Sequence, residues 1–233
     1  MKYVFFLFLL AGIAVELPAQ TNSVAAGAAR SPTTLRNVLQ DMIIKPRPHA
    51  GISGSPFLND NWLLASVVFA DGRKADSVLI KLNAYENKLH FIDDNGEELQ
   101  ATLRVKHVKI LDANPSWNGL EYRCGFSGDP DAFYQVLQDG DGMQLLKKVM
   151  LKVWQARAMG EEDKRSFEYE EEYFLAIGTA TVSSLYKPGK KCELPAEALG
   201  DKKDAVEKYI SANGIRGTKT DDLKKLVTYF NSL

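Results

Sequence analysis

The chain has 233 residues, of which 45% are hydrophobic and 25% are charged, and its formal net charge at pH 7 is −1. This composition is that of an ordinary globular protein and excludes a largely disordered chain. The near-zero net charge excludes the electrostatic footprint of a nucleic-acid-binding protein, so no nucleic-acid partner is expected.

The start of the chain has the three parts of a secretory signal peptide, which we predict to span residues 1–19. Lys2 supplies a positive charge, an unbroken apolar run follows from Tyr3 to Val15, and Ala19 supplies a small residue at the exit. The run is shorter than the roughly 20 residues that an ordinary membrane-spanning helix needs, which argues against the alternative of an uncleaved anchor. Cleavage is therefore expected after Ala19, with cleavage after Gln20 as the alternative.

Export fixes the expected compartment of the mature protein, which is the periplasm or the cell exterior. The protein is not expected to be a lipoprotein, because lipidation needs a cysteine at the cleavage site and the first cysteine is Cys124. No later stretch approaches about 18 consecutive apolar residues, so no integral membrane segment is expected after signal cleavage.

Residues 20–50 are predicted to be a flexible linker that contains one short helix. The first part, up to about Leu35, is rich in Ala, Ser, Thr and Gly and has no apolar period. Between Thr34 and Ile44 the apolar residues fall on one helical face: Leu35, Val38, Leu39, Met42 and Ile43. The segment Lys45-Pro46-Arg47-Pro48 then ends this helix.

Residues 51–192 are predicted to form an antiparallel β domain. Runs with strand character recur and turn signals separate them, over 62–70, 77–85, 88–92, 99–103, 105–111, 120–126, 132–138, 143–154 and 167–176. The turns include Asp71-Gly72, Asp139-Gly140-Asp141-Gly142 and Asn95-Gly96, the strongest two-residue hairpin signal in the chain. The predicted fold class is mainly β (α+β), an antiparallel meander that forms a sandwich or a barrel.

Residues 193–233 are predicted to form a two-helix hairpin that packs on the β domain. The first helix begins at Pro195-Ala196 and ends near Asn213, where Gly214 is the stop signal. Thr220-Asp221-Asp222 is expected to cap the last helix. The apolar residues of that helix form one stripe: Leu223, Leu226, Val227, Phe230 and Leu233. The alternative is that this stripe binds a partner instead of the chain's own core.

The two cysteines, Cys124 and Cys192, could pair as a disulfide. An exported chain meets an oxidising compartment, which permits the bond without requiring it. Pairing also needs the two Cα atoms to lie about 4.4–6.8 Å apart, a distance that the sequence does not fix. The alternative is two separate buried thiols.

No cofactor, metal ligand or catalytic residue is assigned from the sequence. Asp139-Gly140-Asp141-Gly142 opens like a calcium loop, but Met143 and Met150 occupy positions where such a loop needs oxygen ligands. We therefore predict a hairpin turn at this segment.

The histidines and the serine-rich loop do not form recognisable sites either. Gly51-Ile52-Ser53-Gly54-Ser55 fails to match a nucleophile elbow, because Ser55 stands where the last glycine should be. The histidines lack the short spacings of a zinc site, although the second and third could be neighbours across the meander: His49, His90 and His107.

The densest acidic surface is expected on the strand that contains Glu168, Glu170 and Glu172, which would share one face. Three carboxylates could hold a cation or supply the general acid and base of a hydrolase. The preferred interpretation is that Lys148 and Lys152 on the preceding strand pair with these carboxylates across the sheet.

Three segments carry a resemblance to a known group of proteins. They are Gly54-Ser55-Pro56-Phe57-Leu58, the meander from Asp71-Gly72-Arg73 through Val78–Tyr85 to Lys88–Phe91, and the chain end from Asp221 to Leu233. On these segments the chain resembles uncharacterised exported proteins of Bacteroidota, over roughly residues 50–233. The resemblance implies periplasmic or surface localisation and one architecture that includes the tail, but no activity. The chain departs from the group at Leu82, where the group often has an aromatic residue.

These features together predict an exported, non-enzymatic, β-rich binding or structural module of the cell envelope, whose partner is an unknown envelope protein or ligand. Two alternatives are kept. One is a periplasmic carrier, since an antiparallel meander can close around an apolar ligand. The other is a hydrolase that uses the face of Glu168, Glu170 and Glu172.

Overall fold

The structure, a computed structural model, describes residues 35–156, 164–178 and 183–233. Every described residue belongs to one compact unit of the chain. The predicted signal peptide, its cleavage positions and the predicted linker up to residue 34 lie outside the described residues.

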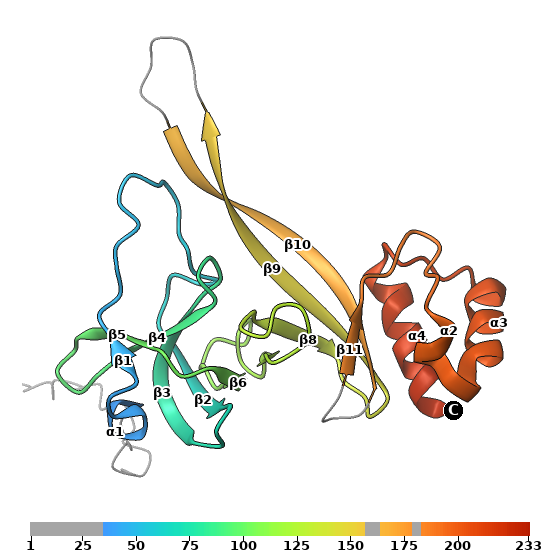
Figure 1. The fold of residues 1–233 in the computed structure, drawn as a ribbon, viewed down its shortest axis with the longest axis horizontal. Coiled ribbons are helices and arrows are strands. Elements are labelled where there is room, and N and C mark those ends of the chain that lie inside the picture. Colours follow the sequence, from blue (N-terminus) through green and yellow to red (C-terminus); the bar gives the residue numbers. More distant parts are fainter. Residues whose placement is uncertain (1–34, 157–163, 179–182) are drawn as a thin grey trace, which may run out of the picture. The chain divides into compact units, whose positions relative to one another are not determined.

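The described strands form one antiparallel sheet (Figure 1), in the order β1-β5-β4-β3-β2-β6-β7-β8-β9-β10-β11. Their bounds are β1 Ile43–Ile44, β2 Leu63–Phe69, β3 Lys74–Asn83, β4 Lys88–Ile92, β5 Glu98–Ala101, β6 Val105–Ile110, β7 Glu121–Arg123, β8 Tyr134–Gln138, β9 Met143–Ala156, β10 Lys164–Gly178 and β11 Ser183–Tyr186. The predicted mainly β, antiparallel class with C-terminal helices is confirmed. The barrel alternative is wrong, because the sheet is not closed and β1 and β11 stand at its two ends.

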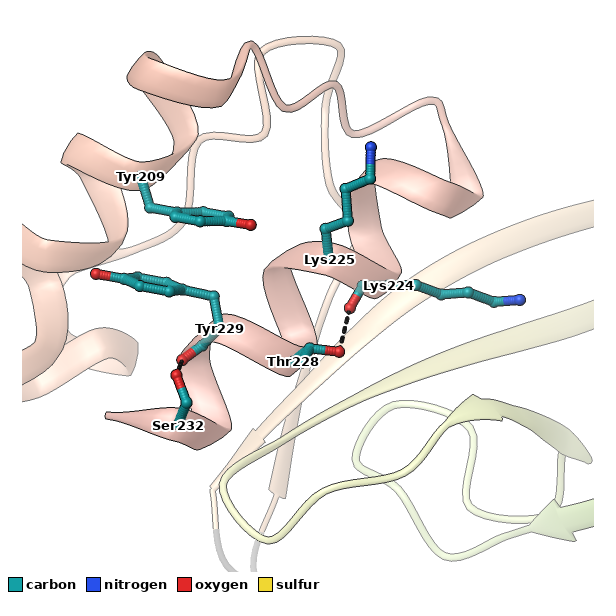
Figure 2. Close-up of a pocket in the computed structure, with 6 residues that line it drawn as sticks. All are labelled: Tyr209, Lys224, Lys225, Thr228, Tyr229 and Ser232. Carbon is teal, nitrogen blue, oxygen red and sulfur yellow. Dashed lines mark hydrogen bonds between the residues drawn. The ribbon is translucent and has the colours of Figure 1, made fainter.

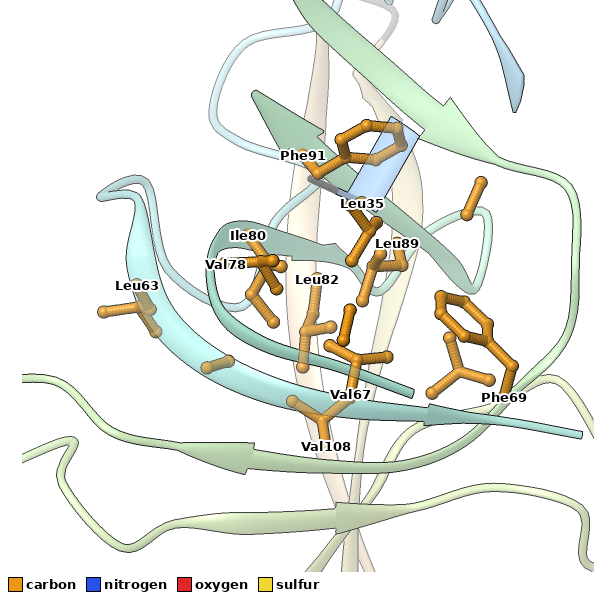
Figure 3. Packing of buried hydrophobic residues seen from close by; sticks show 14 of the residues in the cluster. Leu35, Leu63, Val67, Phe69, Val78, Ile80, Leu82, Leu89, Phe91 and Val108 are labelled. Carbon is orange, nitrogen blue, oxygen red and sulfur yellow. The ribbon is translucent and has the colours of Figure 1, made fainter. Parts of the chain in front are cut away.

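The first hydrophobic core lies on one face of strands β2 to β6, as Figure 3 shows. Strand β2 alternates buried and partly buried residues along its whole length, the pattern of a strand with one face in the core. Phe69, Ile80 and Phe91 contribute fully buried side chains to this core.

A short helix from the predicted linker belongs to the same core. Helix α1 spans Leu35–Leu39, and Leu35 and Leu39 are both buried against the sheet. The helix is shorter than predicted, because Gln40 adopts a φ of 50° and the chain then enters β1, which pairs with β5. Residues 35–44, which were predicted to belong to the linker, are part of the packed β structure.

The second core joins the strands β9 and β10 to the C-terminal helices, which are α2 Ala196–Leu199, the 3-10 turn η1 Gly200–Lys202, α3 Lys203–Asn213 and α4 Thr220–Ser232. Met143, Leu145 and Leu175 from the strands pack with Val206 and Leu226 from the helices. A pair of antiparallel strands cannot bury its own two faces, and these helices cover one of the two faces.

The ends of the C-terminal helices agree only in part with the sequence signals. Gly214 ends α3 in the left-handed conformation, as predicted, and its N–H bonds to Ile210 O. The predicted cap of α4 is wrong, since the capping position is Lys219 and has no side-chain hydrogen bond. Asp222 instead accepts a hydrogen bond from the Arg216 N–H at 3.2 Å, so its carboxylate fixes the loop before the helix.

Candidate functional site

The candidate site lies on the face of the sheet opposite the first core. Strand β4 directs Leu89 and Phe91 into that core, so His90 between them projects to the other face. This face would ordinarily be solvated, yet His90 is only 3% exposed. Phe57 packs on the imidazole, and residues from the loop before β2 and from β3, β5 and β10 line a pocket beside it.

Glu98 orients the imidazole of His90. The two residues are diagonal neighbours across the β4–β5 hairpin, in which Ile92 pairs with Glu98 and His90 with Gln100. His90 Nδ1 lies 2.7 Å from Glu98 Oε1. A carboxylate accepts but cannot donate, so Nδ1 carries the hydrogen in this contact.

A three-residue loop fixes that register. Asp93 N–H donates to Glu97 O at 3.0 Å, and Gly96, with a φ of 77°, closes the loop between them. The Asp93 carboxylate accepts hydrogen bonds from the backbone N–H groups of Asn95 and Glu97, and it contacts the Arg36 guanidinium at 2.6 Å. The Glu97 N–H, followed by Arg36, lowers the pKa of Asp93 below its usual range.

The second ring nitrogen of His90 is the unusual feature of the site. Nε2 is buried and makes no hydrogen bond to any described residue. Because Glu98 holds the hydrogen on Nδ1, Nε2 of the neutral ring presents a lone pair. A buried polar atom without a partner costs about 1–3 kcal/mol, so such an atom calls for an explanation.

A pocket with a volume of about 390 Å³ adjoins this imidazole. This volume falls within the range of small-molecule sites. The lining is mostly apolar with a few polar side chains: Pro46, Arg47, Pro48, His49, Ile52, Gly54, Pro56, Phe57, Asn83, His90, Glu98 and Phe167. We call it the His90 pocket.

The loop between β1 and β2 forms one wall of the His90 pocket and is held at both sides. Ser53 donates its N–H to Arg165 O at 2.9 Å and accepts from the Phe167 N–H at 2.9 Å, which ties the loop to β10. Pro56 O accepts from the Ala84 N–H at 2.9 Å, which ties the loop to the end of β3. The wall is therefore anchored by backbone hydrogen bonds on two strands.

Aromatic rings line the interior of the pocket. The Phe57 ring packs edge-on against His90, with centroids 5.0 Å apart. His49 packs edge-on against Phe167 at 5.7 Å, and its Nε2 lies 3.7 Å from Glu86 Oε1. His49 and His90, which the sequence did not assign to a common site, thus line one pocket, and each has a carboxylate beside it.

The loop wall of the His90 pocket contains the serine that the sequence analysis compared with a nucleophile, Ser55. The Ser55 hydroxyl already has hydrogen-bond partners, because it donates to the Asp60 carboxylate and its Oγ accepts from the Phe57 N–H at 3.2 Å. Among residues 35–156, 164–178 and 183–233, no group of three or more His, Cys, Asp and Glu side chains could hold a metal ion.

A second pocket of about 440 Å³ lies on the exposed side of helices α3 and α4, as Figure 2 shows. Tyr209 and Tyr229 stack face to face with centroids 3.9 Å apart. The hydroxyls of Thr228 and Ser232 donate back to carbonyls of their own helix. This second pocket is open to solvent and contains no buried polar atom that lacks a partner, so it is the weaker candidate.

The predicted acidic face is largely neutralised by lysines. In the observed register Glu168 lies opposite Lys152 and Glu172 lies opposite Lys148. The predicted partners are only partly correct, because Lys152 pairs with Glu170 whereas Lys148 turns away to Asp129. Glu172 pairs instead with a lysine that follows β11, Lys187.

His107 lies outside the candidate site. It stands on β6, and strands β3 and β2 separate it from β4, so it is not a neighbour of His90. Its Nε2 lies 3.5 Å from Glu121 Oε2 on the surface.

The segment Asp139-Gly140-Asp141-Gly142 connects β8 to β9, as predicted. Asn231 of α4 holds this turn in place, because its Oδ1 accepts from the N–H groups of Gly142 and Met143 and its Nδ2 donates to Met143 O. A side chain at Gly140 would collide with Asn231, since an added Cβ would lie 2.1 Å from its Nδ2. The turn therefore serves to dock the last helix.

The two cysteines are free thiols in different cores, so the structure does not form the disulfide considered from the sequence. Cys124 packs against the first core and Cys192 is buried in the second. Burial raises the pKa of Cys192 to about 11. Burial, with Asp131 and Asp129 nearby, holds the pKa of Cys124 well above its usual range.

We expect both thiols to resist modification in the folded protein. The thiolate is the reactive species, and the raised pKa values keep it scarce at pH 8. Titration with DTNB at pH 8 should therefore release little product until urea is added, and should then count two thiols. Two outcomes would contradict the prediction: fast reaction of the native protein, or no thiol in urea, which would indicate a disulfide.

No described helix is both long and apolar enough to cross a membrane. Comparison of the chain with family models, with curated proteins and with solved structures finds no match. What the fold and the site define is an antiparallel β protein with a histidine-based pocket on one face of its open sheet.

Proposed function

We propose that this protein is an exported, non-enzymatic binding module of the cell envelope and that its ligand occupies the His90 pocket. One observation carries the proposal. His90 Nε2 is buried, has no hydrogen-bond partner among the described residues, and belongs to a ring that lines a pocket of about 390 Å³. A ligand that satisfies this atom would recover the free energy that the ligand-free protein loses there.

The hydrolase alternative is less well supported. A glycosidase-type general acid needs a carboxyl group whose pKa is raised, so that it keeps its proton near neutral pH. The hydrogen bond from Lys152, together with its charge, lowers the pKa of Glu170 instead. Glu172 also has a lysine partner, Lys187. A paired, ionised surface of this kind suits solubility better than proton transfer.

The carrier alternative is also less well supported. A carrier needs an enclosed apolar cavity, and the sheet is not closed. The enclosed pocket between Leu63, Ile80 and Trp117 has a volume of about 10 Å³. That volume holds about one water molecule and no apolar ligand.

Binding at the His90 pocket can be tested by NMR on untagged mature protein with 15N-labelled histidine. The chain has three histidines, so the side-chain spectrum is simple to assign. We expect members of a library of small ring compounds to shift the Nε2 signal of His90 and to leave His107 unchanged. If no library member shifts His90, the pocket is not a ligand site and the proposal fails.

A matched pair of variants tests the same site by affinity. His90→Phe removes the acceptor while keeping a flat ring, and we expect it to weaken any library hit by at least about tenfold, the loss of one buried hydrogen bond. His107→Phe makes the same change outside the pocket and should leave affinity unaltered. Equal affinity in both variants would contradict the assignment.

The proposed export can be tested on the full chain expressed in a bacterium with a periplasm. We expect the protein in the periplasmic fraction, with an intact mass that places its first residue at Gln20 or Thr21. Leu9→Lys interrupts the apolar run and should leave the precursor uncleaved in the cytoplasm. Full-length wild-type protein in the cytoplasm would refute the export proposal without touching the pocket.

A further inference from the structure

We infer that the His90 pocket takes a neutral cyclic ligand that places a hydroxyl group on His90 Nε2. A sugar ring is the simplest biological ligand of this class. The inference rests on the proposed binding function and adds the chemical class of the ligand.

The imidazole favours a hydroxyl over an ionic group. Neutral His90 offers a lone pair at Nε2, which needs a donor, whereas protonated His90 offers an N–H, which needs an acceptor. A hydroxyl can donate to the first form and accept from the second. An ammonium group satisfies only the neutral form, and a carboxylate satisfies only the protonated form.

The charges around the pocket favour a neutral ligand. The carboxylates of Glu98 and Glu86 each already have an imidazole partner, His90 and His49. An ionic ligand would lose its hydration without gaining a net counter-charge, because these two carboxylates are offset by two cations: Arg47 in the lining and Lys81, whose ammonium lies over the Phe57 ring. Arg47 also lines the pocket, but it is exposed, and an ion pair with an exposed arginine contributes little.

The walls favour a ring with C–H groups on its faces. Phe57 and Phe167 supply aromatic surfaces, and three prolines supply flat apolar ones: Pro46, Pro48 and Pro56. Such walls pack against the faces of a saturated ring, while the few polar groups of the pocket can bind substituents on the ring edge. A hydroxylated ring combines both kinds of surface.

Access to Nε2 requires one side chain to move. The atom is closed off from solvent, and the ring that packs on the imidazole is Phe57, at 5.0 Å between centroids. Phe57 sits on the loop before β2 and is itself partly exposed, so it can rotate without opening the first core. Phe57 is therefore a positioning residue, whose ring signals should shift together with those of His90 when the ligand binds.

The test uses three probes that share one six-membered ring and differ in one group: cyclohexanol, cyclohexylammonium and cyclohexanecarboxylate. A set of methyl hexopyranosides supplies the biological form of the neutral probe. Binding is followed by the Nε2 signal of His90 and the ring signals of Phe57, with His107 as the internal control. We expect cyclohexanol and at least one glycoside to shift both signals saturably, and each ionic probe to bind at least about tenfold more weakly.

Each outcome separates this inference from the proposed function. Tighter binding of either ionic probe at His90 would overturn the hydroxyl class and leave the binding function in place. Failure of all probes together with the general library would overturn both. Because the readout is on wild-type protein, the result does not depend on whether His90→Phe folds.

Discussion

Replacing Phe91 by alanine should lower the free energy of unfolding by about 3–5 kcal/mol, the usual cost of a large-to-small change in a packed core. Phe91 is 0% exposed and lies in the first core. The deletion leaves a cavity beneath β4, the strand that carries His90 on its other face. Urea unfolding followed by tryptophan fluorescence measures the change.

The matched control is Leu79→Ala on the neighbouring strand β3. Leu79 is 43% exposed and faces away from the core, so its truncation should cost less than about 1 kcal/mol. Losses of similar size for the two variants would contradict the position of the first core. If the Phe91→Ala protein folds but binds a ligand more weakly at the His90 pocket, packing in the first core positions the site on the other face of β4.

The antiparallel meander could be predicted because its signals are local. Strand β2 is an almost continuous apolar run that ends shortly before the turn at Asp71-Gly72, and β4 begins and ends at the predicted residues, Lys88 and Ile92. Turn signals such as Asp71-Gly72 lie where the chain reverses. Each of these depends on a short window of sequence, which is what periodicity and turn chemistry report.

The edges of the sheet could not be predicted in the same way. The predicted helical face extended from Leu35 to Ile43, yet Ile43 and Ile44 form β1 because β5 offers them a backbone partner. Strand β11 was missed for a similar reason, since Ser183–Tyr186 has little strand character and is set by its pairing with β10. In both cases a tertiary partner decides the conformation, and local propensity does not.

The candidate site was missed although one signal for it was present. Alternation around Leu89 and Phe91 places His90 on the opposite face, and the turn at Asn95-Gly96 folds β5 back beside it. A two-residue turn would give the wrong register, however, because the observed loop has three residues. The remaining walls come from the loop at Phe57 and from Phe167, about 110 residues later, and no local pattern brings these together.

The second large effect on stability is expected in the last helix, α4. Its size decides whether the apolar stripe of this helix packs on the chain's own core or is kept for a partner. Leu226→Ala should lower the free energy of unfolding by about 2–5 kcal/mol, because Leu226 is 0% exposed in the second core. Leu233→Ala, at the end of the same predicted stripe, should change it by less than about 0.5 kcal/mol, because Leu233 is 50% exposed. Urea unfolding of both variants measures the difference. A stripe reserved for a partner would leave the stability of the isolated protein unchanged in both variants, whereas a stripe docked on Met143 and Leu175 makes Leu226 indispensable and Leu233 dispensable.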